Sequence, residues 1–199
     1  MHENLPAKKL HPPGDFAIWI IIYIELLTFA LLFLGYAFSR RSNIEMFSAS
    51  QLQLDQVSGF INTLILITSS YFVAKAVQAV RHMTDESIKA SSRAAARWLL
   101  FAILSAGGFL VVKMLDFIHV FGQGITLSTN TFFMFYIILT VFHFMHVLLG
   151  SFILIVLYRK TKEQGYTRHD HKGMETGASY WHMVDLLWIV LFPLIYIIR

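Results

Sequence analysis

The sequence predicts an all-α membrane protein with five transmembrane helices, and three observations support this fold class. The chain of 199 residues is 56% hydrophobic and only 14% charged, whereas a soluble globular domain carries roughly 25% charged residues. Five apolar runs are each long enough to span ~30 Å of hydrocarbon at ~1.5 Å per residue. Their apolar residues surround the helix axis, as in helices that contact lipid and other helices. We predict a single transmembrane domain over residues 1–199, with helices at about 16–38, 60–80, 98–120, 132–157 and 177–198.

The Lys and Arg residues lie mostly in the loops and predict the orientation of the chain. Eleven of them fall in the N-terminal tail and in the loops after the second and fourth helices, and three fall on the opposite side. The positive-inside rule therefore predicts a cytoplasmic N-terminus and an external C-terminus. Because the basic residues follow the topology and do not form one stripe, we expect no nucleic-acid partner.

Several other features limit the possibilities. The chain has no Cys, which excludes disulfides, Cys-ligated iron–sulfur clusters and thiolate copper sites. The first apolar run is not typical of a cleaved signal peptide, because it is long and lacks a small-residue cleavage site.

The segment 42–58 is compatible with either a short interfacial helix or a loop. Pro193 is expected to distort the last helix, and Gly107, Gly108 and Gly150 either allow close helix contact or are simply tolerated.

Titratable side chains inside the spans are costly and therefore need an explanation. Glu25 lies ~14 Å from the cytoplasmic end of the first helix, and His146 and His143 lie ~17 and ~21 Å from the same end of the fourth. Asp185 lies ~12 Å along the fifth helix, with His182 one turn below it. Residues three apart share a helix face. We therefore expect these five residues to form one buried polar cluster, which is a candidate lipid-binding site, and to offset one another's burial cost.

Three interpretations of this cluster remain open at this point. The histidines could ligate haem or a metal, the acids and imidazoles could relay protons, or the cluster could fix helix packing through hydrogen bonds. A His pair three residues apart cannot place both imidazoles on opposite faces of one haem. We therefore predict no catalytic residue, no metal ligand and no redox cofactor in this chain.

Four further polar or aromatic positions are secondary candidates. Lys113 and Asp116 are three apart near the outer end of the third helix and are expected to pair locally. Trp181 shares a face with Trp188 and is expected to pack or to contact lipid. The fourth secondary candidate, Asn62, belongs to a motif described next.

Several motifs resemble those of subunit III of the haem-copper oxidases. Residues 142–150, FHFMHVLLG, are similar to the family's fourth-helix signature, and residues 180–188, YWHMVDLLW, resemble the closing helix. Residues 62–64 and 68–70 are similar to the signature in the helix before the basic loop. Glu25, within YIELLTF, matches the family's membrane-embedded, carbodiimide-reactive glutamate.

The resemblance extends over residues 15–196, with informative departures. Longer family members have seven helices, and this chain looks like the five-helix form without the first two. Lys113 stands where the family often has Gln, residues 116–117 stand where it often has Glu and Tyr, and Lys75 replaces a residue that is often aromatic. The opening at 14–19 is nearer to the subunit III-like branch associated with nitric oxide reductase.

The resemblance implies a non-catalytic accessory subunit of an oxidase or nitric oxide reductase complex in respiratory electron transport. It implies a multi-pass protein of the bacterial plasma (inner) membrane that binds phospholipid and supports the stability and proton uptake of a catalytic subunit I-type partner. Haem and copper would belong only to partner subunits. Two alternatives are a self-sufficient haem b cytochrome that uses His143, His146 and His182, and a small proton-conducting protein that uses Glu25 and Asp185.

Overall fold

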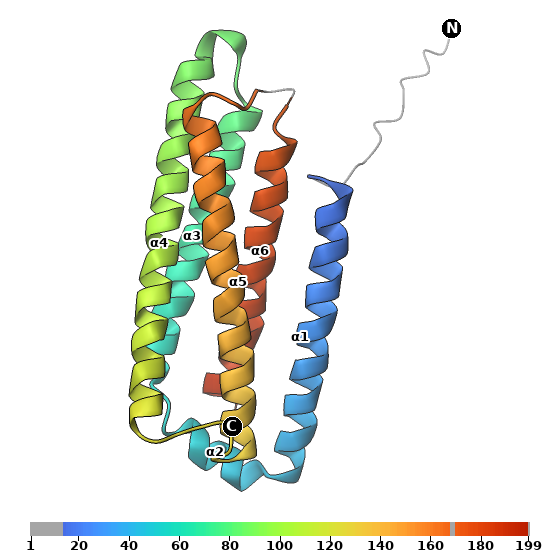
Figure 1. Ribbon diagram of the computed structural model, residues 1–199, viewed down its shortest axis with the longest axis vertical. Helices are drawn as coiled ribbons and strands as arrows, with labels where there is room; N and C mark the ends of the chain where they lie inside the picture. Colours follow the sequence, from blue (N-terminus) through green and yellow to red (C-terminus); the bar gives the residue numbers. More distant parts are fainter. Residues whose placement is uncertain (1–13, 168–169, 199) are drawn as a thin grey trace, which may run out of the picture.

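The computed structural model describes residues 14–167 and 170–198, and within them it contains helices and no strand. Five helices are long and apolar enough to cross a membrane, which confirms the predicted fold class. Figure 1 shows them running side by side along the long axis of the molecule. These helices are α1 (Phe16–Ser42), α3 (Gln56–Arg81), α4 (Ile88–Gly122), α5 (Thr131–Lys162) and α6 (Lys172–Phe192).

The observed helices extend beyond the apolar runs that predict them. The clearest case is α4, which begins at Ile88, ten residues before the predicted start. Its first turns are rich in Ala, Ser and Arg, and Ala and Arg favour a helix without being apolar enough to register as a membrane span. Hydropathy therefore locates the part of each helix inside hydrocarbon, whereas the backbone stays helical beyond it.

The segment between the first two spans contains a short helix, α2 (Ile44–Gln51). Of the two alternatives for this segment, a short helix or a loop, the structure therefore has the helix. Its Phe47 is fully buried and packs edge-on against Tyr36 and Phe132. The Gln51 side chain donates hydrogen bonds to the carbonyls of Ile195 and Ile198 at 2.9 and 3.0 Å. These bonds satisfy carbonyl groups that the end of the last helix leaves without helical partners.

Pro193 changes the geometry of the last span, as the sequence predicts. The residues Pro193–Ile197 form a π-helical turn at the end of α6, closed by the Ile198 N–H on the Pro193 carbonyl at 2.9 Å. Proline has no N–H to donate and its ring clashes with the carbonyl four residues earlier, so the regular ladder cannot continue through it.

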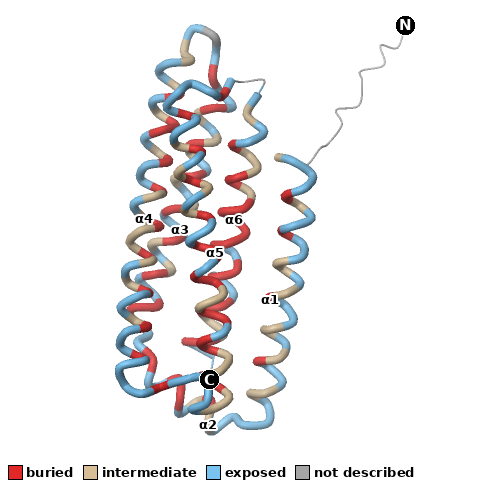
Figure 2. Tube along the Cα trace, in the orientation of Figure 1, coloured by how far each residue is buried: buried red, intermediate tan, exposed pale blue. Residues whose placement is uncertain are grey.

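The helices α3, α4, α5 and α6 form a four-helix bundle, and α1 packs on α5 and α6. The buried residues of α1 are confined to Ile18, Ile22, Phe29 and Tyr36, whereas its other faces are largely exposed (Figure 2). Because these faces are apolar, they fit a helix that meets lipid or another membrane subunit.

The start of α1 and the end of α6 lie at opposite ends of the bundle, as five spans require (Figure 1). The loops that join α3 to α4 and α5 to α6 lie at the same end as the start of α1. Which of these ends is cytoplasmic stays a prediction from the basic residues. Four of the residues counted for it, Lys8, Lys9, Arg168 and Arg199, lie outside the described residues.

Candidate functional site

Glu25 of α1 and His146 of α5 form an acid–imidazole pair inside the membrane. The Glu25 Oε2 and His146 Nε2 atoms are 3.0 Å apart, and the two side chains are 26% and 9% exposed. His146 Nδ1 lies 2.8 Å from the carbonyl oxygen of Phe142. Since that oxygen can only accept, Nδ1 carries a hydrogen and donates it. The close approach of Nε2 to the Glu25 carboxyl group joins α1 to α5.

His143 lies on the same helix but in a different environment. It is fully buried, and its ring centroid lies 5.1 Å from Trp188, 5.9 Å from Phe109 and 6.5 Å from Phe29. Neither ring nitrogen has a hydrogen-bond partner within the described part of the chain. His143 therefore belongs to the aromatic core, whereas His146 faces α1.

His182 and Asp185 form a third environment, between α6 and α3. The Ser70 hydroxyl of α3 lies 2.6 Å from His182 Nδ1, and Asp185 Oδ2 lies 3.7 Å from the same nitrogen. Asp185 is buried, whereas the His182 side chain is 42% exposed. Within the described residues, no hydrogen bond or ion pair connects this group to Glu25 and His146. The five residues expected in one cluster are thus divided among three helix contacts.

Lys113 occupies an aromatic cage formed by α4, α5 and the end of the last span. Its side chain is fully buried, and its ammonium nitrogen lies between 5.2 and 5.6 Å from the centroids of four rings, those of Phe117, Tyr136, Trp188 and Tyr196. The ammonium donates to the Tyr196 hydroxyl at 2.8 Å and to the Tyr136 hydroxyl at 3.4 Å. Cation–π attraction is strongest where the cation is desolvated, as it is here.

The expected pairing of Lys113 with Asp116 is present, with 3.6 Å between Nζ and Oδ2. The other carboxylate oxygen accepts a hydrogen bond of 2.6 Å from Ser58 of α3. Asp116 therefore connects α4 to α3 while it neutralises the buried ammonium.

Asn62 and Trp181 are fully buried, and the polar atoms of both side chains have no hydrogen-bond partner within the described residues. The Trp181 ring lies against Gly150, where a Cβ atom would come within 2.8 Å of it. Trp181 is thus a packing residue, as expected, and it explains why α5 has a glycine at this contact.

Glu175, at the start of α6, is a connecting residue that sequence reasoning did not single out. It accepts hydrogen bonds from Arg81 Nε and Nη2 at 2.9 and 2.7 Å and from the Gly14 N–H at 3.2 Å. Gly14 has a φ of +88°, and a Cβ atom there would lie 2.9 to 3.0 Å from Thr176, so only glycine fits without strain.

The sequence patterns also did not single out Ser70, Tyr136 and Tyr196 as partners of the polar residues, although Ser70 lies in one of the family-like motifs.

His143 and His146 do not fit the alternative interpretation as haem ligands. Both nitrogens of His146 are engaged, and the His143 ring is fully buried against the rings of Phe109 and Trp188. Within the described residues, no group of three or more His, Cys, Asp or Glu side chains comes together as a metal site. This geometry disfavours the interpretation as a self-sufficient haem cytochrome.

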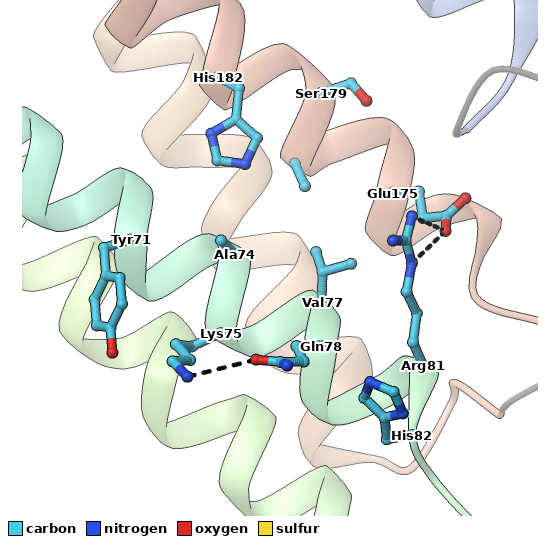
Figure 3. Close-up of a pocket in the computed structure, with 11 residues that line it drawn as sticks. Tyr71, Ala74, Lys75, Val77, Gln78, Arg81, His82, Glu175, Ser179 and His182 are labelled. Carbon is cyan, nitrogen blue, oxygen red and sulfur yellow. Dashed lines mark hydrogen bonds and ion pairs between the residues drawn. The ribbon is translucent and has the colours of Figure 1, made fainter.

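A groove of about 620 Å³ lies between α3 and α6, on the end of the bundle where α3 ends and α6 begins. Figure 3 shows the side chains that line it, with Tyr71 and His182 towards the middle of the bundle and Arg81, His82 and Glu175 near the helix ends. This volume is within the ~300–1,000 Å³ range of small-molecule sites.

Comparisons with known proteins agree with the family-like motifs. Residues 15–199 match the model of the family described as cytochrome c oxidase subunit III. The chain is 31% identical to cytochrome c oxidase subunit 3 of Synechocystis sp., over 99% of this chain and 78% of the relative. It is 29% identical to the subunit of the same name from Thermostichus vulcanus, over 98% and 93% of the two chains. It is 25% identical to quinol oxidase subunit 3 of Bacillus spizizenii, over 98% and 94%. With the family model matching nearly the whole chain, this protein belongs to the cytochrome c oxidase subunit III family.

Proposed function

We propose that this chain is a non-catalytic accessory subunit of a haem-copper oxidase complex in the bacterial plasma membrane. The observation that carries the proposal is the family match over residues 15–199, in a chain whose five long helices can span a membrane. The relatives reported above are named as subunits of cytochrome c and quinol oxidases. In this role the haem and copper belong to partner subunits, and the chain supports the stability and proton uptake of the catalytic one.

The exposed apolar surface supports a lateral partner in the membrane. Large hydrophobic side chains such as Tyr23, Leu27 and Leu31 on α1 are 62 to 65% exposed. The described segments outside the long helices are loops, the short helix α2, a single helical turn at Asp85–Ser87 and the π-helical turn, which offer little surface for a partner in water. A larger membrane subunit and bound phospholipid are therefore the partners that we propose.

Copurification tests this function. A tagged chain extracted in mild detergent from cells grown under respiring conditions is expected to bring a larger haem- and copper-containing subunit with it, seen as a Soret band and identified by mass spectrometry. An unrelated tagged five-helix protein from the same membranes is the control. A chain that purifies alone contradicts the proposal. A nitric oxide reductase subunit as the partner would instead support the branch that residues 14–19 resemble.

We propose that Glu25 acts mainly by holding α1 against α5. Glu25→Gln is expected to preserve assembly and turnover, because an amide N–H can donate to His146 Nε2 as a carboxyl O–H does. Glu25→Ala leaves that nitrogen without a partner, which costs about 1–3 kcal/mol, and is expected to weaken retention of the chain in the complex. Subunit retention and proton uptake by the intact complex measure both effects. Loss of proton uptake in Glu25→Gln with assembly unchanged would show that Glu25 is a proton relay.

The orientation is proposed from the excess of Lys and Arg at one end. Alkaline phosphatase fused after Arg199 is expected to be active, and the same enzyme fused before Met1 inactive, because it folds only outside the cytoplasm. The reverse pattern in a chain that inserts normally would reverse the topology.

A further inference from the structure

A small pocket lies between the start of α4 and the end of α5, apart from the groove between α3 and α6. Its volume is about 110 Å³. These two helices pack together, and Figure 1 shows the start of α4 and the end of α5 at the same end of the bundle. A water molecule takes about 30 Å³ of the liquid, so the pocket has room for one group of a few heavy atoms, such as a phosphate. The residues that line it are Lys89, Ser92, Arg93, Ala96, Lys162 and Gln164.

The lining of this pocket is cationic, and no carboxylate is among its described residues. The side chains of Lys89, Arg93 and Lys162 form no ion pair and no hydrogen bond within the described part of the chain. By contrast, the neighbouring Lys160 ammonium lies 4.6 Å from the centroid of the Tyr166 ring. The positive-inside rule accounts for cations at this end of the bundle. It does not account for three of them around one cavity without an acid.

Ser92 adds a buried hydrogen-bonding group to the lining. The residue is only 4% exposed, and its hydroxyl has no hydrogen-bond partner within the described residues. Burying a hydroxyl without a partner costs free energy, so a ligand that accepts its hydrogen is favoured. Gln164, just after α5, contributes an amide that can also donate. Neutral donors beside three cations suit an anion with several acceptor oxygens.

The two helix ends at the pocket differ in their effect on an anion. The start of α4 favours one, because the N-terminal end of a helix carries a partial positive charge. The carbonyl groups at the end of α5 oppose one, but two of them are already bound. The Gln164 N–H donates to the Thr161 carbonyl at 3.1 Å, and the Gly165 N–H donates to the Lys160 carbonyl at 2.9 Å. The repulsion from this end is therefore reduced.

The pocket lies at the outer edge of the lipid headgroups. Lys89 and Ser92 lie ~13 and ~9 Å beyond Trp98, where the apolar run of α4 begins, and Lys162 lies ~8 Å beyond the end of the run at Leu157. Each headgroup layer is only ~5–8 Å thick, since a bilayer with ~30 Å of hydrocarbon measures ~40–45 Å in total. A soluble anion therefore reaches the pocket from water, whereas the phosphate of a lipid lies deeper.

We propose that this pocket binds the phosphate group of a small water-soluble anion, with Lys89, Arg93 and Lys162 around it and the Ser92 hydroxyl donating to it. A phosphate group carries a charge of about −1.5 to −2 near pH 7, which balances most of the three cations, whereas one carboxylate would balance only one. The bound anion would hold the start of α4 to the end of α5. This site belongs to the chain itself and does not depend on the proposed complex.

Isothermal titration calorimetry of the full chain in an uncharged detergent, with inorganic phosphate at constant ionic strength, tests the site. The wild type is expected to bind one phosphate per chain in a saturable manner. Arg93→Gln should raise the Kd about tenfold, the effect of one charge-assisted hydrogen bond. Ser92→Ala should raise it about fivefold, the effect of one neutral hydrogen bond, and alanine keeps the helix intact. Arg97→Gln, on the same helix but outside the lining, is the matched control and should change the Kd less than twofold.

Three results would each overturn the proposal. The first is a wild type without saturable phosphate binding. The second is an equal rise in Kd for Arg97→Gln and Arg93→Gln, which would show diffuse attraction to a basic surface. The third is displacement of phosphate by phosphatidylglycerol added to the micelles, which would identify a site for lipid headgroups. Because the chain is measured without partners, phosphate binding by a chain that joins no oxidase would contradict only the proposed function.

Discussion

Replacing Lys113 with alanine is expected to lower the free energy of unfolding by about 3–5 kcal/mol, the usual cost of breaking a buried ion pair by removing one partner. The change removes the ammonium from a cage of four rings and takes a hydrogen-bond donor away from Tyr136 and Tyr196. It also leaves the Asp116 carboxylate, whose side chain is only 17% exposed, without its counter-charge.

Two variants test whether the cage causes this loss. Lys113→Gln keeps a donor for the Tyr196 hydroxyl, so a smaller loss is expected. Lys75→Ala removes a lysine whose ammonium has no acidic partner and should change the unfolding free energy by roughly 0.5 kcal/mol or less. Unfolding in mixed detergent micelles, followed by Trp fluorescence, measures all three variants. If Lys113→Ala costs no more than Lys75→Ala, the cage does not stabilise the fold.

Gly150→Val is expected to cost about 1–3 kcal/mol or more, because it overpacks the contact between α5 and α6. A Cβ atom at Gly150 would lie 2.8 and 2.9 Å from the Trp181 ring. That ring is rigid and fully buried, so it cannot turn aside as the end of a flexible side chain could.

The same substitution at Gly107 is the control, because a Cβ atom there meets nothing within 4 Å. Gly107→Val should be neutral or slightly stabilising, since glycine is a poor helix former. The comparison uses the unfolding free energy in micelles and the fraction of chain retained in membranes. Equal costs at the two positions would mean that helix propensity, and not the Trp181 contact, determines the effect.

The sequence by itself determined the five spans, because a bilayer requires long apolar helices whatever their neighbours are. It also predicted the distortion at Pro193 and the pairing of Lys113 with Asp116, which are local effects of a missing N–H and of helical spacing. It did not reveal that Gly150 is a tight contact and Gly107 is not, since the two differ only in what faces them from another helix.

The tertiary structure decided which partner each polar side chain has. His143 and His146 are three residues apart, yet one packs against Trp188 and the other bonds to Glu25. The depth of a residue along its helix can be counted from the sequence. Which neighbouring helix packs against that residue cannot be read from the sequence. Tyr136 and Tyr196 meet Lys113 across 23 and 83 residues of chain. Helical spacing cannot predict such contacts, because they depend on how α4, α5 and the π-helical turn pack together.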